Sequence, residues 1–176
     1  MRVLITGVQN VIEESVVKLA LEGMEGKAKF RILSFSDFMD TEGDVAEEQK
    51  VLRNTQKRIK DAVQLKMIKA GPGDHIILNG YFTAKGKHGF FPVIDRMLLD
   101  TFKPDFVVNI DVDPLAVQDK IDDVKQFEYH QELERTCAMF VGAYCGCSFK
   151  FIYTGIEGAR EAANELYELL KGMMVK

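Results

Sequence analysis

The sequence predicts a three-layer α/β/α fold built around a five-stranded parallel sheet. Three observations support this class. Five short apolar runs recur along the chain, helical segments separate them, and turn-forming residues mark junctions such as 71–73 and 103–105. Alternating strands and helices are typical of a parallel sheet with helices on both faces. At 176 residues, the chain is expected to form one domain, residues 1–176, with a sizeable core.

The predicted strands are continuously apolar instead of alternating, which is typical of strands that are buried on both faces. They cover residues 2–6, 30–34, 75–79, 106–110 and 149–153. The predicted helices cover residues 11–22, 46–69, 90–99, 128–144 and 156–173. The net acidic stretch at 114–130 is expected to be a mobile, solvated connection.

Composition and charge narrow the range of functions. An apolar content of 47% and a formal charge of −4 indicate a globular protein and give no indication of nucleic-acid binding. No apolar run approaches the roughly 18 residues that a membrane span needs. The first residues lack the pattern of a signal peptide. We therefore expect a cytoplasmic protein with no membrane partner.

The chain has three cysteines, Cys137, Cys145 and Cys147. An odd number of cysteines in a cytosolic protein argues against a disulfide framework. The Cys145-Gly146-Cys147 motif lacks a second cysteine pair or a histidine at metal-ligand spacing. We interpret these residues as buried structural cysteines that pack as small hydrophobes. The alternative is a functional pair.

The segment that follows the first predicted strand has the layout of a phosphate-binding loop. Such a loop reads G-x-x-x-x-G-K-[ST]: its amides and lysine bind phosphate, and its hydroxyl binds Mg²⁺. Counted from Gly7, the second glycine, the lysine and the hydroxyl positions hold Ile12, Glu13 and Glu14. Two acidic side chains there would repel a polyphosphate. ATP and Mg²⁺ are therefore not expected as ligands, and the cofactor, if there is one, is unknown.

The candidate binding residues of this degenerate loop are Gly7, Gln9, Asn10, Val11, Ile12, Glu13, Glu14 and Ser15. The β-branched Ile12 strongly disfavours the positive φ that a loop glycine can adopt. The helix is therefore expected to begin early, with Asn10 as its N-cap. Glu13 and Glu14 would then lie in the first turn, where the helix dipole favours carboxylates.

Other candidate contacts lie beyond the loop. Asn79 ends the third strand, where P-loop proteins often place an Asp in the Mg²⁺ shell. It could make a residual polar contact to a ligand, or only a strand-end hydrogen bond. Lys85 and Lys87 follow the same strand, at the edge of the sheet where ligands bind. With Arg53 and Arg58 of the long helix, they are possible anion contacts; the alternative is that both segments are solvated surface.

Taken together, these segments resemble the archaeal-type adenylate kinases, which are P-loop nucleoside monophosphate kinases, over nearly the whole chain. The similar segments are residues 2–11, 55–59, 85–92, 102–105 and 128–144. The resemblance implies a P-loop kinase-like fold and a homo-oligomer, specifically a trimer. The apolar stretch at 139–144 gives separate support, because it must be buried in a subunit interface or in the core.

The chain departs from this family where phosphate would be handled. The loop glycine, lysine and threonine are replaced by Ile12, Glu13 and Glu14, and the Asp-Thr-His strand end by Asn79-Gly80-Tyr81. The arginine-rich lid is replaced by the acidic segment 119–125. The sequence therefore predicts a catalytically silent adenylate-kinase-like protein that acts as a binding, scaffolding or regulatory component. The alternative is a nucleoside monophosphate kinase, or a nucleotide-binding protein, with an unorthodox loop.

Overall fold

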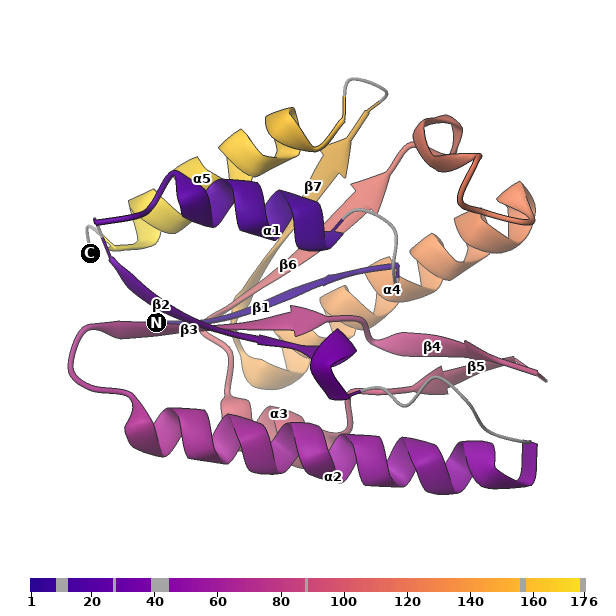
Figure 1. Cartoon of the computed structure of the whole chain (residues 1–176), viewed down its shortest axis with the longest axis horizontal. Helices are drawn as coiled ribbons and strands as arrows, with labels where there is room; N and C mark the ends of the chain where they lie inside the picture. Colours follow the sequence, from indigo (N-terminus) through magenta and orange to yellow (C-terminus); the bar gives the residue numbers. More distant parts are fainter. Residues whose placement is uncertain (9–12, 27, 39–44, 88, 156–157, 175–176) are drawn as a thin grey trace.

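A computed structural model describes residues 1–8, 13–26, 28–38, 45–87, 89–155 and 158–174 of the chain (Figure 1). The side chains of residues 13 and 45–49 lie outside this description. Among the described residues, no helix is both long enough and apolar enough to cross a membrane.

A five-stranded parallel sheet forms the centre of the molecule. Its strands are β1 (Arg2–Gly7), β2 (Lys29–Ser34), β3 (Asp74–Gly80), β6 (Phe106–Val112) and β7 (Ser148–Thr154). The strand order is β2-β3-β1-β6-β7, and every neighbouring pair is parallel. The predicted parallel sheet is confirmed, and each strand ends within about two residues of its predicted bounds.

Helices cover both faces of this sheet, which confirms the three layers (Figure 1). One face carries α1 (Glu13–Glu22) and α5 (Ala159–Met174). The other carries α2 (Val45–Lys69), α3 (Arg96–Phe102) and α4 (Val124–Cys145). Each face has its own apolar core, because successive side chains of a strand point to opposite faces of the sheet and therefore contact different helices. Ile5 packs under α1 and α5, whereas Leu4 packs under α2, α3 and α4.

The helix predicted over 90–99 is wrong in its first half. Gly89–Pro92 forms strand β5, which pairs antiparallel with β4 (Thr83–Gly86) in a small hairpin. Two adjacent aromatic residues, Phe90 and Phe91, favour a strand over a helix here. The helix begins only at Arg96, after Asp95, whose side chain accepts a hydrogen bond from the Leu98 backbone N–H at 2.7 Å.

The segment 114–130 is more ordered than the predicted solvated connection. It contains a 3₁₀ turn, η2 (Pro114–Val117), and the start of α4, which Asp123 caps. Val117 and Phe127 are buried with Val8 and Val112 in a small apolar cluster. Most of the residues between η2 and α4 are exposed as predicted, whereas the apolar side chains on either side of them anchor the segment to the strand ends.

A short 3₁₀ helix, η1 (Phe35–Phe38), follows β2 and lies against the end of β3. The ring of Phe35 is fully buried and lies over the backbone of Gly80. A Cβ atom at position 80 would overlap that ring, so only glycine allows this approach. The contact holds η1 beside Asn79, the residue before Gly80.

Candidate functional site

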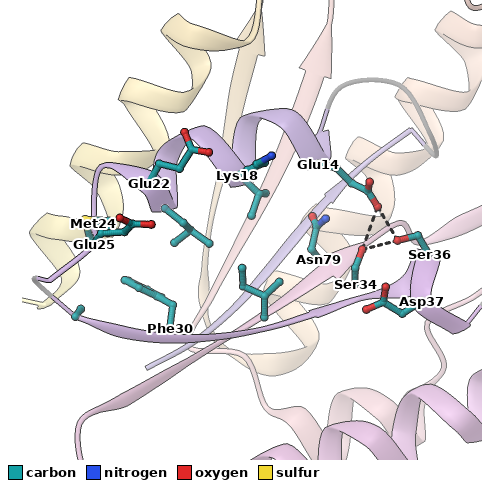
Figure 2. A pocket seen from close by; sticks show the side chains of 14 residues that line it. Glu14, Lys18, Glu22, Met24, Glu25, Phe30, Ser34, Ser36, Asp37 and Asn79 are labelled. Carbon is teal, nitrogen blue, oxygen red and sulfur yellow. Dashed lines mark hydrogen bonds between the residues drawn. The ribbon is translucent and has the colours of Figure 1, made fainter.

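A groove of about 620 Å³ lies on the α1 face of the sheet (Figure 2). Residues of α1, the turn after it, β2, η1 and the end of β3 line the groove. One end of the groove lies at the carboxyl ends of β2 and β3, which is the edge where open parallel sheets bind their ligands. Its size is that of a small-molecule pocket.

Strand register brings two polar side chains to this end of the groove. Ser34 of β2 and Asn79 of β3 are direct neighbours in the sheet, and both line the groove. Asn79 is only 3% exposed, and its Oδ1 atom has no hydrogen-bond partner among the described residues. A buried carbonyl oxygen without a partner costs free energy, so it marks a place where a donor would be favourable.

Glu14 of α1 lies above these strand ends. Its Oε1 atom accepts hydrogen bonds from Ser36 Oγ at 2.7 Å and from Ser34 Oγ at 3.1 Å (Figure 2). The two serine hydroxyls are themselves 2.8 Å apart. These bonds tie the start of α1 to β2 and η1, so the Glu14 carboxylate is held at the polar end of the groove.

The charged side chains of the groove are mostly acidic. Among the described residues that line it, Glu14, Glu22, Glu25 and Asp37 oppose Lys18. A phosphate site needs converging donors and positive charge. The described part of this groove offers a negative field instead.

The structure places the predicted loop residues as follows. Gly7 is buried at the end of β1, while Glu14 and Ser15 are exposed in the first described turn of α1. Glu13 also lies in that turn, as predicted, although only its backbone is described. Residues 9–12 lie outside the described residues, so the predicted N-cap at Asn10 stays a prediction.

The four predicted basic contacts do not line this groove. Arg53 and Arg58 are exposed on α2, which covers the opposite face of the sheet (Figure 1). Lys85 and Lys87 are exposed on the β4–β5 hairpin and its turn. The structure therefore does not bring these cations together with Glu14. Their role as anion contacts stays a prediction.

A buried polar chain under α4 was not predicted. The Thr6 hydroxyl donates to Asn109 Oδ1 at 3.0 Å, and Asn109 Nδ2 donates to Asp111 Oδ1 at 2.9 Å. Arg135 Nε then donates to the second oxygen of Asp111 at 2.7 Å. Burial raises the pKa of Asp111, and the bond from Arg135 opposes that rise. The sequence contains a signal for this chain. Asn109 and Asp111 are two positions apart within an apolar strand, so their side chains point to the same face of the sheet.

A second buried polar cluster joins α4 to the β4–β5 hairpin. The fully buried carboxylate of Glu134 accepts hydrogen bonds from the backbone N–H groups of Phe82 and Thr83, both at 2.8 Å. The Nε2 atom of His130 lies 2.9 Å from the hydroxyl oxygen of Thr83, and burial lowers the pKa of His130. These contacts lie outside the groove and hold the hairpin in place.

The three cysteines are free, partly buried and packed against the core of the α2, α3 and α4 face. Burial raises the pKa of all three thiols, that of Cys145 to about 11. Protonated thiols are poor nucleophiles and poor metal ligands, which supports the structural interpretation over a functional pair. In the described part of the chain, no group of three His, Cys, Asp or Glu residues could hold a metal ion.

The strand order, the parallel pairing and the helix after β1 define an α/β fold of the P-loop NTPase kind. A crystal structure of a GTPase from Pyrococcus abyssi, solved in the apo form, shares this fold with a TM-score of 0.54. The match covers 96% of this chain and 72% of that one, at 12% identity. At this level of identity, the similarity shows the fold alone.

Sequence comparison gives the nearer relationship. The chain is 27% identical to an adenylate kinase from Pyrococcus abyssi, covering 96% of this chain and 94% of that protein. It is 24% identical to an adenylate kinase from Methanococcus vannielii, covering 96% and 97%. No model of a known protein family matches the chain. The chain is thus adenylate-kinase-like over nearly its whole length, which confirms the resemblance predicted from the sequence.

Proposed function

We propose that this protein is a catalytically silent adenylate-kinase-like protein that acts as a binding, scaffolding or regulatory component. The observation that carries the proposal is the position of Glu14. Its carboxylate is held by Ser34 and Ser36 at the carboxyl edge of the sheet, within a mostly acidic groove. A kinase needs cations at this edge to stabilise the transferring phosphoryl group.

The described residues of the groove do not fit Mg²⁺ with ATP. Glu14 and Asp37 are the described carboxylates at its polar end, and no third metal-ligating acid joins them. Four acidic side chains against one lysine would also repel three phosphates. Loss of one preorganised contact to a transition state can lower a rate about 10²–10³-fold. Replacement of several such contacts is therefore expected to leave no useful turnover.

A second candidate function is a nucleoside monophosphate kinase, or a nucleotide-binding protein, with an unorthodox loop. The observation that favours it is the extent of the sequence similarity. The chain matches adenylate kinases from Pyrococcus abyssi and Methanococcus vannielii along nearly their full length. Cations would then have to reach the groove from elsewhere, for example from Lys85 or Arg53. In the described arrangement these side chains lie outside the groove.

Two measurements on the full chain distinguish these functions. The first is a coupled assay of phosphoryl exchange between ATP and AMP with Mg²⁺. We expect no turnover, whereas a rate in the ordinary kinase range of roughly 1–100 s⁻¹ would overturn the proposal. Trace activity that disappears on further purification would not count as turnover.

The second measurement is a thermal-shift series with ATP, ADP and AMP, each with and without Mg²⁺. A ligand at 100 times its dissociation constant adds ~2.7 kcal/mol to the free energy of unfolding, which is readily detected. We expect no stabilisation by ATP with Mg²⁺. Stabilisation without turnover would favour the nucleotide-binding alternative over a protein that has lost the nucleotide.

A further inference from the structure

The groove beside α1 has two chemically different ends. Its polar end carries the carboxylates of Glu14 and Asp37 and the side chain of Asn79 (Figure 2). The other end has an apolar surface of Leu21, Met24, Phe30 and Ile32, of which Ile32 is 43% exposed, and the exposed carboxylates of Glu22 and Glu25 lie beside it (Figure 2). A ligand that fits both ends therefore has a hydrophobic body and one polar head.

Asn79 indicates which polar head the site would accept. Its Oδ1 atom is buried, is aimed into the groove and has no partner among the described residues. A carbonyl oxygen can only accept a hydrogen bond, so the missing partner is a donor. The neighbouring Glu14 and Asp37 carboxylates are acceptors as well. All three groups therefore favour a head that carries several N–H or O–H donors.

The field of the groove indicates the charge of that head. Among its described lining residues, Glu14 and Asp37 lie at the polar end, Glu22 and Glu25 lie at the other end, and Lys18 provides the one ammonium group. The partial positive charge at the start of α1 would favour an anion, but the carboxylate of Glu14 already lies there. A cationic head is therefore favoured over a neutral or anionic one.

A metal cation fits these observations less well than an organic cation. The described residues provide no group of three metal-ligating side chains. A bare metal ion would also leave the apolar end of the groove uncovered. An ammonium group provides up to three donors, enough for Asn79, Glu14 and Asp37, and an attached apolar body would cover Phe30 and Ile32.

We propose that this groove binds an organic ammonium ion with an apolar body, its head held by Glu14, Asp37 and the unpartnered Oδ1 of Asn79. The inference rests on the proposed function, because the polar end of the groove lies where a kinase of this fold would hold phosphate. It adds a class of ligand, a hydrophobic primary amine, to a protein that is proposed to act as a binding, scaffolding or regulatory component.

The test compares three ligands of one shape by isothermal titration calorimetry with the full chain. They are 3-phenylpropylamine, its neutral alcohol 3-phenylpropanol and its anionic counterpart 3-phenylpropanoate. We expect the amine to bind about tenfold or more tightly than the alcohol, since hydrogen bonds to charged groups are the stronger ones. The carboxylate should not bind. Equal binding of amine and alcohol, or preference for the carboxylate, would overturn the proposal.

Variants locate the binding to the predicted end of the groove. Glu14→Gln should weaken amine binding about fivefold or more, because it removes the charge but keeps the shape. Glu161→Gln, an exposed change outside the groove, is the matched control and should leave the affinity unchanged. An unchanged affinity in Glu14→Gln would contradict the assignment.

Asn79 is tested in two directions. Asn79→Leu removes the acceptor and should weaken amine binding, while Asn79→Asp adds charge and should strengthen it. If Asn79→Leu fails to fold, Asn79→Asp alone decides, since a weaker or equal affinity there opposes the proposal. The ATP and AMP assay on the same samples separates the two proposals. Turnover overturns the silent kinase, whereas absence of amine binding overturns only this inference.

Discussion

The Oε1 atom of Glu134 accepts a hydrogen bond from the hydroxyl of Thr83 at 2.6 Å, and both residues are buried. The two residues are 51 positions apart in the chain. Their contact joins α4 to the β4–β5 hairpin, which borders the carboxyl edge of the sheet. Together with His130, this buried carboxylate therefore fixes the position of the hairpin.

The first prediction is that Glu134→Ala strongly destabilises the protein. The change leaves the N–H groups of Phe82 and Thr83 buried without an acceptor. Each such group costs about 1–3 kcal/mol, so we expect a loss of about 3 kcal/mol or more in the free energy of unfolding. Urea denaturation measures it. The control Glu132→Ala, an exposed change on the same helix, should cost no more than about 1 kcal/mol.

The second prediction contrasts two buried asparagines. Asn109→Leu should cost about 1–3 kcal/mol, because the Thr6 hydroxyl and the Oδ1 atom of Asp111 each lose a buried hydrogen bond. Asn79→Leu should change stability by less than about 0.5 kcal/mol, because the Oδ1 atom that it removes has no described partner. Paired thermal melts provide the comparison. Equal losses in the two variants would show that Asn79 Oδ1 is satisfied within the protein.

The third prediction concerns acid stability. The backbone N–H of Gly71 and then the Arg31 guanidinium lower the pKa of Asp74 from 3.8 to about 2. A depressed carboxyl pKa stabilises the folded state above the unfolded value, and this contribution is lost as the pH falls from about 4 towards 2. Asp74→Asn should therefore lower stability at pH 7 and flatten the decline below pH 4. The exposed control Asp61→Asn should change neither quantity.

The fourth prediction is that repair of the loop restores binding but not catalysis. The triple change Ile12→Gly, Glu13→Lys and Glu14→Thr replaces two negative charges with one positive charge. We expect ATP binding that weakens with added salt. Turnover should stay negligible, because Asn79 and the acidic segment 119–125 still lack the charges that a transition state needs.

The outcome of the loop repair is informative in both directions. A competent kinase would show that only the loop had been disabled, which contradicts the wider loss that we propose. No gain in ATP affinity would show that the segment from Gly7 to Ser15 is not a former phosphate loop. Nucleotide affinity and ATP–AMP turnover, measured side by side with the unaltered protein, distinguish these cases.

The fifth prediction is self-association through α4. Met139, Phe140 and Tyr144 are 42%, 67% and 40% exposed, so the apolar stretch at 139–144 is only partly buried in the protein's own core. We expect a trimer at micromolar concentration by light scattering. Phe140→Glu should shift it to smaller species, while Leu115→Glu, an equally exposed change on η2, should not. A strictly monomeric unaltered protein would contradict the prediction.

The sheet could be predicted because its central strands β3, β1 and β6 are buried on both faces and are therefore apolar at most positions. The β4–β5 hairpin could not, because Phe90 and Phe91 continue an apolar pattern that also suits a helix. They pair with Lys85 and Ala84 of β4, and β4 is itself held by the hydrogen bond from Thr83 to Glu134 on the distant helix α4. Tertiary contacts therefore decided a segment that local pattern left ambiguous.

The candidate site was predictable only in part. The sequence indicates Glu14 and Asn79 separately, Glu14 from its place at a helix start and Asn79 from its place at a strand end. That they share one groove with Ser34 follows from the register of β2 and β3, which no local motif encodes. The chain from Thr6 to Arg135 was missed for a similar reason, since its donors and acceptors become neighbours only when β1, β6 and α4 pack together.

The central position of β1 also has a consequence for biosynthesis. This strand is synthesised before both of its neighbours in the sheet, which end at Gly80 and Val112. At a translation speed of about 5–20 residues per second, β1 waits on the order of 5–20 seconds before its second neighbour has been synthesised. Until then, a growing chain carries an apolar strand with at least one unpaired edge, and an unpaired edge exposed in this way is prone to aggregation.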